Sequence, residues 1–178
     1  MAINKEFLAK IVIEPLDSKH KRAAFSCGET RIDNYIRHSA ANHAKNDFVK
    51  VYVASKTDSD IVIGYYVLGP HAIDATSLPP EFIKKLPKWP LISAIYLSMI
   101  AVDNSCQGKG LGSFLIADAF ERCIQAADII GGYFIVLDAI NEKAARLYRR
   151  CGFIELSSPP LRMIVSAKKV RGMIAAAK

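Results

Sequence analysis

The feature that most constrains this chain is an uncharged run that leads directly into a glycine-rich loop. The run from Leu91 to Val102 contains no charged residue, which is typical of a central strand covered on both faces. It continues through Asp103-Asn-Ser-Cys106 into Gln107-Gly-Lys-Gly-Leu-Gly112, and a long helical pattern ending near Ala127 follows. This order of strand, loop and helix predicts an α/β sheet with the loop at the end of a buried strand.

The glycines at positions 108, 110 and 112 alternate at the start of the predicted helix. A helix N-terminus leaves about four backbone N–H groups without partners and carries partial positive charge. Because glycine lets an anion approach these amides, the loop predicts a phosphate or diphosphate site, to which Lys109 adds a charge. The pattern also leaves open a tight turn that needs glycine only for its backbone. A P-loop and the dinucleotide fingerprint do not fit, since the loop closes on Gly112-Ser113.

Weaker patterns extend the sheet on both sides of this unit. Apolar runs predict strands at 10–15, 48–55, 61–68, 133–138, 153–156 and 161–167, the second and third forming an antiparallel pair. Helical spacing predicts helices at 30–45, 81–85 and 141–151; the first has Thr30 as its N-cap and Ile32, Ile36, Ala40 and His43 on one side. Gly152 is expected to end the last helix in the left-handed conformation. We therefore predict a mixed α/β sheet of about six to seven strands with helices on both faces.

Length and composition bound the remaining possibilities. With 178 residues, 51% of them hydrophobic, the chain suits a single domain over residues 1–178. The longest charge-free stretch, Trp89 to Val102, is shorter than the roughly 20 residues of a membrane span, and the N-terminus lacks the apolar core of a secretory signal, so we expect a cytoplasmic location. The four scattered cysteines predict no metal site. A net charge of +7 favours an anionic partner such as a nucleic acid, a nucleotide or an acidic protein tail.

Two motifs resemble the signature of the GNAT acetyltransferases. Ile100-Ala-Val-Asp103 followed by Gln107 to Gly112 is similar to the Q/R-x-x-G-x-G/A motif of that family, and Asn141 to Phe153, with Tyr148 within it, is similar to its second half. The resemblance covers residues 97–156 and implies a GNAT fold in which two splayed central strands hold acetyl-CoA, the acetyl donor, without a metal. The cofactor contacts that it implies are Ile100, Ala101, Val102, Gln107, Gly108, Lys109, Gly110, Leu111, Gly112 and Asn141.

The N-terminal third resembles one branch of that family, the TacT-like toxins of type II toxin–antitoxin systems. The resemblance lies in Phe25-Ser-Cys-Gly28, in Ile32-Asp-Asn-Tyr-Ile36 with Ala40, and in Lys50-Val-Tyr-Val-Ala54. Known members acetylate the α-amine of aminoacyl-tRNA and stop translation. It implies an aminoacyl-tRNA substrate, a ribbon-helix-helix antitoxin, contact with operator DNA through the antitoxin complex, and a homodimer. Where members often carry a strand arginine, this chain has Met99.

Tyr148 is the candidate catalytic residue. Its spacing from Ala144 and Cys151 is that of an ordinary core face, so periodicity by itself favours a packing role. The resemblance implies instead that Tyr148 donates a proton to the CoA sulfur, which a phenol that stays neutral at pH 7 can do. Asn141 has two compatible interpretations, as the N-cap of the Tyr148 helix and as a hydrogen-bonding partner of the cofactor.

The predicted strand offers no base for a lysine acceptor. No carboxylate lies between Leu91 and Val102, and a lysine amine has a pKa near about 10.4, whereas an α-amine near about 8 is partly neutral at physiological pH. The missing base therefore favours an α-amine acceptor. Two other functions stay open: acetylation of a small amine or a protein N-terminus, and a catalytically idle partner that binds CoA or nucleic acid.

Basic residues supply candidates for contact with RNA. Lys143, Arg146 and Arg150 form a stripe on the predicted Tyr148 helix, and Lys50 lies in the predicted strand at 48–55. Charges of this kind usually belong to solvated surface. With the toxin resemblance, a surface that follows the phosphates of the tRNA acceptor stem is favoured, and its binding should weaken steeply with salt.

Overall fold

A computed structural model describes residues 4–177 of the chain, which divides into two compact units. The first comprises Met1–Gly69 with Met99–Ala119, and the second comprises Pro70–Ser98 with Phe120–Lys178. Across residues 4–177, none of the helices combines the length and the apolar character that crossing a bilayer requires. The single domain over residues 1–178 stays a prediction.

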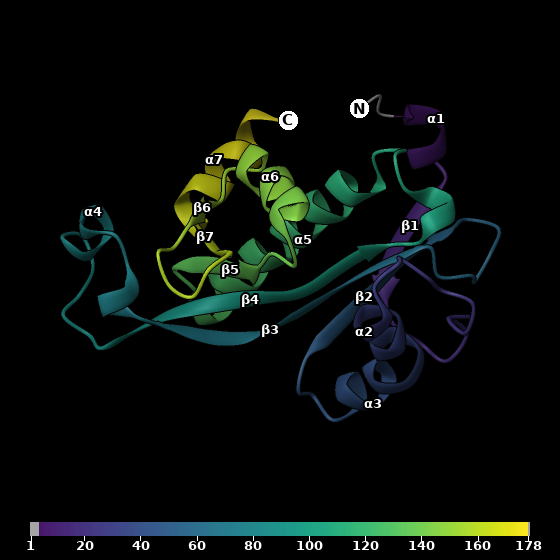
Figure 1. Cartoon of the computed structure of the whole chain (residues 1–178), viewed down its shortest axis with the longest axis horizontal. Helices are drawn as coiled ribbons and strands as arrows, with labels where there is room; N and C mark the ends of the chain where they lie inside the picture. Colours follow the sequence, from purple (N-terminus) through teal and green to yellow (C-terminus); the bar gives the residue numbers. More distant parts are fainter. Residues whose placement is uncertain (1–3, 178) are drawn as a thin grey trace. The chain divides into compact units, whose positions relative to one another are not determined.

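The first unit contains three strands, several short helices and the start of a long one (Figure 1). In chain order these are α1 (Lys5–Leu8), β1 (Ile11–Pro15), α2 (Thr30–Asn34), the π-helix η1 (Tyr35–Ser39), α3 (Ala40–Lys45), β2 (Lys50–Lys56), β3 (Gly64–Asp74), the 3₁₀ helix η3 (Asn104–Cys106) and α5 (Leu111–Ile130). β1 pairs antiparallel with β2, and β2 pairs antiparallel with β3, from Lys50 opposite Leu68 to Ala54 opposite Gly64. The predicted antiparallel pair is therefore confirmed.

Alternation along β3 places helices on both faces of this part of the sheet. Tyr65 and Val67 pack in a core with Ile32, Ile36 and Ala40 of the α2–α3 segment. Gly64 and Tyr66 face the opposite side of the sheet. A Cβ added at Gly64 would lie 3.0 Å from Leu115 of α5, and the Tyr66 hydroxyl donates a hydrogen bond to Asp118 of the same helix. Residues 30–45 are helical as predicted, but Thr30 is not the N-cap. Glu29 holds that place in an extended conformation, because its carbonyl already accepts the first helical bonds, from Ile32 and Asp33.

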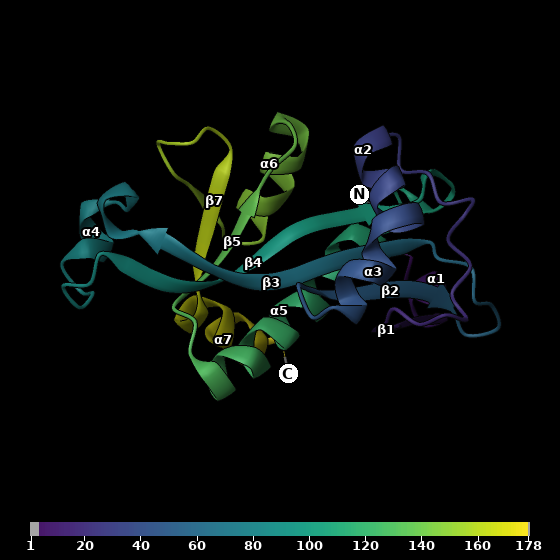
Figure 2. The same cartoon turned by 90° about the horizontal axis from the view of Figure 1, so that it is seen from below.

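The second unit contains the other strands, except the last four residues of β4, and four further helical segments. They are the 3₁₀ helix η2 (Ala75–Ser77), α4 (Pro80–Ile83), β4 (Leu91–Val102), β5 (Phe134–Asp138), α6 (Glu142–Arg150), β6 (Ile154–Glu155), β7 (Arg162–Ser166) and α7 (Ala167–Ala176). The strand order is β1-β2-β3-β4-β5-β7-β6, a seven-stranded mixed sheet, as predicted. Phe134, Val136, Ile92, Ala94 and Ile164 fill the core of this unit. In Figure 2, α6 lies beside β5, and α7 begins where β7 ends.

The β4–β5 pair is the parallel element of the sheet. Its ladder joins Ala94–Tyr96 to Phe134–Val136, three residue pairs, and β4 then continues to Val102. β4 has the predicted bounds, but the expectation that both faces are covered is only partly correct. Burial is complete at Ala94, Ile95 and Leu97, whereas Tyr96 and residues 98–100 are half-buried, because hydrophobic composition does not report which neighbours cover a strand.

Some predicted boundaries are wrong, and the C-terminal helix was missed. The predicted strand at 61–68 is β3, which begins at Gly64 and runs through Gly69 and Pro70 to Asp74. α5 extends to Ile130, three residues beyond Ala127. α7 was not predicted at all; Ser166 caps it by accepting a hydrogen bond from the Lys169 amide at 3.3 Å.

A polar cluster at the end of β5 predicts a pH-dependent stability. The Arg162 guanidinium donates to both Asp138 carboxylate oxygens at 2.8 Å, and the Tyr96 hydroxyl donates at 2.6 Å. These bonds, the arginine first, lower the pKa of Asp138 below its usual range. Asp138→Asn should reduce the free energy of unfolding at pH 7 by about 1–2 kcal/mol. Because the pKa is lowered in the folded state, this stabilisation is complete above the unfolded value of about 4 and is lost as the pH falls through the folded-state pKa. Urea titrations at pH 7 and at a series of pH values below 4 measure this; a destabilisation by Asp138→Asn that stays constant down to the lowest pH would contradict the assignment.

Candidate active site

The glycine loop adopts the backbone that its sequence predicts. Gly108 and Gly110 have φ angles of +77° and +91°, the left-handed region that glycine adopts without strain. The first turn of α5 closes with the Phe114 amide donating to the Gly110 carbonyl at 3.1 Å. A Cβ built on Gly108 meets no atom within 4 Å. The loop therefore needs glycine for its turn, and the space beside Gly108 is open, so the residues present fit a diphosphate group.

The Gln107 side chain anchors the loop to the end of β4. Its amide nitrogen lies 3.1 Å from the Val102 carbonyl, 3.1 Å from the Cys27 carbonyl and 3.0 Å from Oδ1 of Asn104. The amide therefore ties the loop both to the strand that precedes it and to the N-terminal segment. This gives Gln107 a positioning role that the sequence did not reveal.

Asp103 holds the other side of the same junction. Its carboxylate accepts hydrogen bonds from the Ser26 amide at 2.9 Å and from the Ser105 hydroxyl at 2.6 Å. Burial raises the pKa of Asp103, but these hydrogen bonds outweigh it and the net pKa is lowered. An ionised Asp103 therefore fixes the segment between β4 and the loop. An aspartate directly after a strand and before Asn-Ser is a recognisable turn signal, which could have indicated this role.

The Lys109 ammonium is held by the loop itself. It donates to the Ser105 carbonyl at 2.8 Å and lies 5.4 Å from the centre of the Phe7 ring in α1. Lys109 thus stabilises the curvature of the loop, in addition to placing a positive charge beside the glycine amides.

The predicted strand contacts Ile100, Ala101 and Val102 lie at the end of β4, in the same unit as the loop. Ala101 is buried in the core, and the other two are half-buried. Met99 packs on that core, with its sulfur 3.7 Å from the Tyr65 hydroxyl, which donates to the Ile32 carbonyl at 2.8 Å. Met99 therefore fills apolar space at the position where an arginine was expected.

Tyr148 lies on α6, in the second unit, with 7% of its surface exposed. Its ring packs edge-on against Phe153 at 5.9 Å between centroids, so the side chain lies on the buried face of α6. Burial raises the pKa of the phenol well above its usual range, and its hydroxyl makes no hydrogen bond to another residue between positions 4 and 177. The side chain is a fixed, protonated phenol whose hydroxyl is uncommitted.

Asn141 caps α6, as one of its two interpretations predicted. Its side-chain oxygen accepts a hydrogen bond from the Ala144 amide at 2.9 Å. Gly152 ends the helix with a φ of +92°, also as predicted. Together the two ends fix the helix on which Tyr148 is carried.

The candidate RNA-binding cations have different environments. Lys143, Arg146 and Arg150 are exposed on α6 and form no hydrogen bond or ion pair with another residue in the described part of the chain. Arg149, between them, is bound to Glu142 at 2.6 Å and Glu155 at 2.5 Å and is structural. Lys50, in the first unit, pairs with Asp47 at 2.5 Å. Among residues 4–177, no group of three metal-ligating side chains gathers.

Comparison with known proteins agrees with this fold and loop. Residues 47–155 match the family model described as Acetyltransferase (GNAT) domain, which defines the class of protein. A "Probable toxin TacT" of Sinorhizobium fredii is 38% identical over 93% of this chain and 96% of its own length. A "tRNA-acetylating toxin" of Mycobacterium tuberculosis is 34% identical over 85% of this chain and 89% of its own. The chain belongs to the GNAT acetyltransferases, in the branch of the TacT-like toxins.

Two solved structures resemble the chain over nearly its whole length. AtaT complexed with acetyl-methionyl-tRNAfMet has a TM-score of 0.85 and 26% identity, and covers 92% of this chain and 99% of its own. AtaTR bound with AcCoA has a TM-score of 0.82 and 25% identity, and the match covers 93% of this chain and 99% of the AtaTR chain. The predicted GNAT fold is therefore confirmed.

Proposed function

We propose that this protein transfers the acetyl group of acetyl-CoA to the α-amine of aminoacyl-tRNA and thereby blocks translation. The observation that carries the proposal is the glycine loop, left-handed at Gly108 and Gly110 with open space before its amides. This loop occurs in a chain whose relatives over most of their length are a toxin and a tRNA-acetylating toxin. When bound, acetyl-CoA supplies an acetyl thioester that an amine can attack.

The first unit supplies the residues proposed to hold acetyl-CoA. The amides of residues 108–112 bind the diphosphate, because they lie at the start of α5, where the helix dipole is positive. The backbone of Ile100, Ala101 and Val102 and the loop residues Gln107 and Lys109 complete this part. From the second unit, Asn141 is proposed as a further cofactor contact, in addition to its role as the cap of α6.

Tyr148 is proposed to be the general acid of the reaction. The acid must hold its proton at pH 7 and release it only to the departing thiolate. Burial raises the pKa of Tyr148, which keeps the proton on its oxygen, and the packed Phe153 holds the ring still. General acids of this kind contribute about 10²–10⁴ in rate.

An α-amine is the acceptor that least requires a catalytic base from this protein. β4, from Leu91 to Val102, carries no carboxylate that could act as a base. An α-amine with a pKa near about 8 is partly neutral at pH 7, whereas a lysine needs a base to lose its proton. The acceptor stem is proposed to lie on Lys143, Arg146 and Arg150, with Lys50 as a further contact.

The partners follow from the toxin relationship. We propose a homodimer in the bacterial cytoplasm, where charged tRNA is available, restrained by a ribbon-helix-helix antitoxin. The antitoxin complex would bring the toxin to operator DNA. Size-exclusion chromatography with light scattering, with and without the product of the adjacent reading frame, tests the dimer and the antitoxin contact.

An acceptor panel tests the proposed activity. Labelled acetyl-CoA is offered with charged tRNA, deacylated tRNA, a polyamine and a peptide with a free N-terminus. We expect label to enter charged tRNA at least 100-fold faster than the other acceptors, because only that acceptor joins an α-amine to RNA phosphates. Faster labelling of the peptide or the polyamine would establish an ordinary small-amine or protein acetyltransferase instead.

A further inference from the structure

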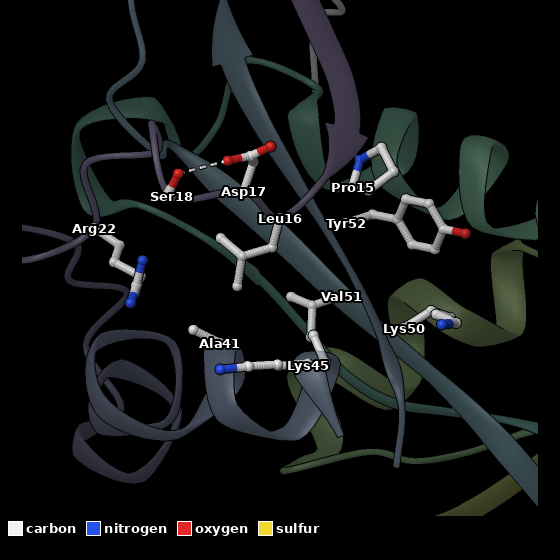
Figure 3. A pocket seen from close by; sticks show the side chains of 11 residues that line it. Pro15, Leu16, Asp17, Ser18, Arg22, Ala41, Lys45, Lys50, Val51 and Tyr52 are labelled. Atoms are coloured by element: carbon white, nitrogen blue, oxygen red, sulfur yellow. Dashed lines mark hydrogen bonds between the residues drawn. The ribbon is translucent and has the colours of Figure 1, made fainter. Parts of the chain in front are cut away.

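The first unit contains a cavity of about 650 Å³ that the proposed reaction does not use. The end of β1, α3 and the start of β2 surround it (Figure 3). Its lower wall is apolar, formed by Leu16, Ala41 and Val51. Such a volume falls within the range of sites that bind small molecules or parts of larger ones.

Three cations line this cavity. Figure 3 shows Arg22 and Lys45 on one side and Lys50 on the other. Nε of Arg22 is buried without a hydrogen-bond partner, and neither Arg22 nor Lys45 pairs with a carboxylate in the described part of the chain. A buried donor without an acceptor costs free energy. An anion bound in the cavity supplies that acceptor and is attracted by both cations.

A carboxylate in the cavity lining limits the kinds of anion that the cavity can bind. Asp17 also lines the cavity, and its carboxylate accepts a hydrogen bond from the Ser18 hydroxyl at 2.8 Å. That bond lowers the pKa of Asp17, so it stays ionised at neutral pH. An acidic peptide would bring its carboxylates against this one. A ribose-phosphate, in contrast, presents a 2′-hydroxyl donor next to its anion, which suits a site with both cations and an acceptor.

The cavity is separate from the glycine loop. Its lining residues belong to β1, the segment that follows β1, α3 and β2, and none of residues 107–112 is among them. The two sites therefore share no lining residue.

We propose that this cavity seats a ribose-phosphate unit of the tRNA substrate, with the phosphate on Arg22 and Lys45 and the ribose hydroxyl on Asp17. The proposal rests on the proposed function, since it assigns a second anchor to the same RNA. The cavity would give the enzyme a second contact with the RNA, separate from the glycine loop.

Binding of deacylated tRNA to the full-length protein tests the proposal without turnover. Fluorescence anisotropy over a salt series should show about tenfold weaker binding for Arg22→Gln and for Lys45→Gln, with a salt slope smaller by about one. Arg22→Lys should lose about threefold, because it keeps the charge without the Nε donor. Lys21→Gln is the matched control: it removes the neighbouring exposed charge, which does not line the cavity, and should change binding less than twofold.

Three outcomes would overturn the assignment. The first is equal losses in Arg22→Gln and Lys21→Gln, which mean diffuse attraction. The second is a polyglutamate peptide that competes with tRNA more strongly than a 5′-mononucleotide does, which means a peptide site. The third is unchanged binding in Lys45→Gln, whose exposed side chain can be replaced without disturbing the fold. These results are independent of the acceptor panel: if wild type acetylates charged tRNA but the variants bind it normally, only the cavity assignment fails.

Discussion

Replacing Tyr148 by phenylalanine should lower turnover with charged tRNA by about 10²–10⁴, with little change in the affinity for acetyl-CoA. The substitution removes one hydroxyl, which makes no hydrogen bond within residues 4–177, and keeps the ring that packs on Phe153. The free energy of unfolding should therefore change by less than about 0.5 kcal/mol. Single-turnover kinetics, with calorimetry for acetyl-CoA binding, separate the chemical step from binding.

Tyr133→Phe is the matched control for this experiment. Tyr133 belongs to the same unit, is 38% exposed and packs edge-on against Phe134, so its hydroxyl can be removed with equal ease. Its loss should leave turnover unchanged. If Tyr148→Phe kept more than a tenth of the wild-type turnover, Tyr148 would be a packing residue only.

Gly108→Ala should weaken acetyl-CoA binding by about 10- to 100-fold. A hydrogen bond to a charged group contributes about 1.5–3 kcal/mol, and each 1.4 kcal/mol is a factor of ten in affinity. The new methyl group would occupy the space in front of the loop amides, where no atom lies within 4 Å, and the φ of +77° adds backbone strain. Calorimetry with acetyl-CoA measures the loss directly.

Gly131→Ala separates strain from coenzyme contact. Gly131 has a φ of +81° and equally open space around its Cβ position, but it follows the other end of α5. Both alanines should cost about 1 kcal/mol of stability, and only Gly108→Ala should weaken binding. Equal affinities in the two variants would mean that the glycines serve the turn alone.

Most of the architecture was predictable because its signals are local. β4 has the predicted bounds, since an uncharged run flanked by Pro90 and Asp103 can form little else. The helix caps at Asn141 and Gly152 were predictable for the same reason: capping depends on one side chain or one backbone conformation. These parts required no knowledge of distant neighbours.

The errors lie at the ends of elements and at a residue whose contacts form only in the fold. Gly69-Pro70 is a strong break signal, yet β3 continues to Asp74. Thr30 is a good capping residue, but the Glu29 carbonyl begins the helix one position earlier. Gln107 was predicted as a cofactor contact, and its amide bonds to three groups of the chain became evident only with the fold.

The sequence by itself determined the class of protein, the glycine loop and the candidate acid, because motifs at fixed spacing specify chemistry on adjacent elements. Only the tertiary structure showed that the Tyr148 phenol is buried, or that the cavity is lined by Asp17 and Arg22 from the segment after β1 together with Lys45 from the end of α3. The physical reason is that burial and unpaired charge are properties of surroundings. Those surroundings form when segments far apart in the chain pack together, and no spacing along the chain records them.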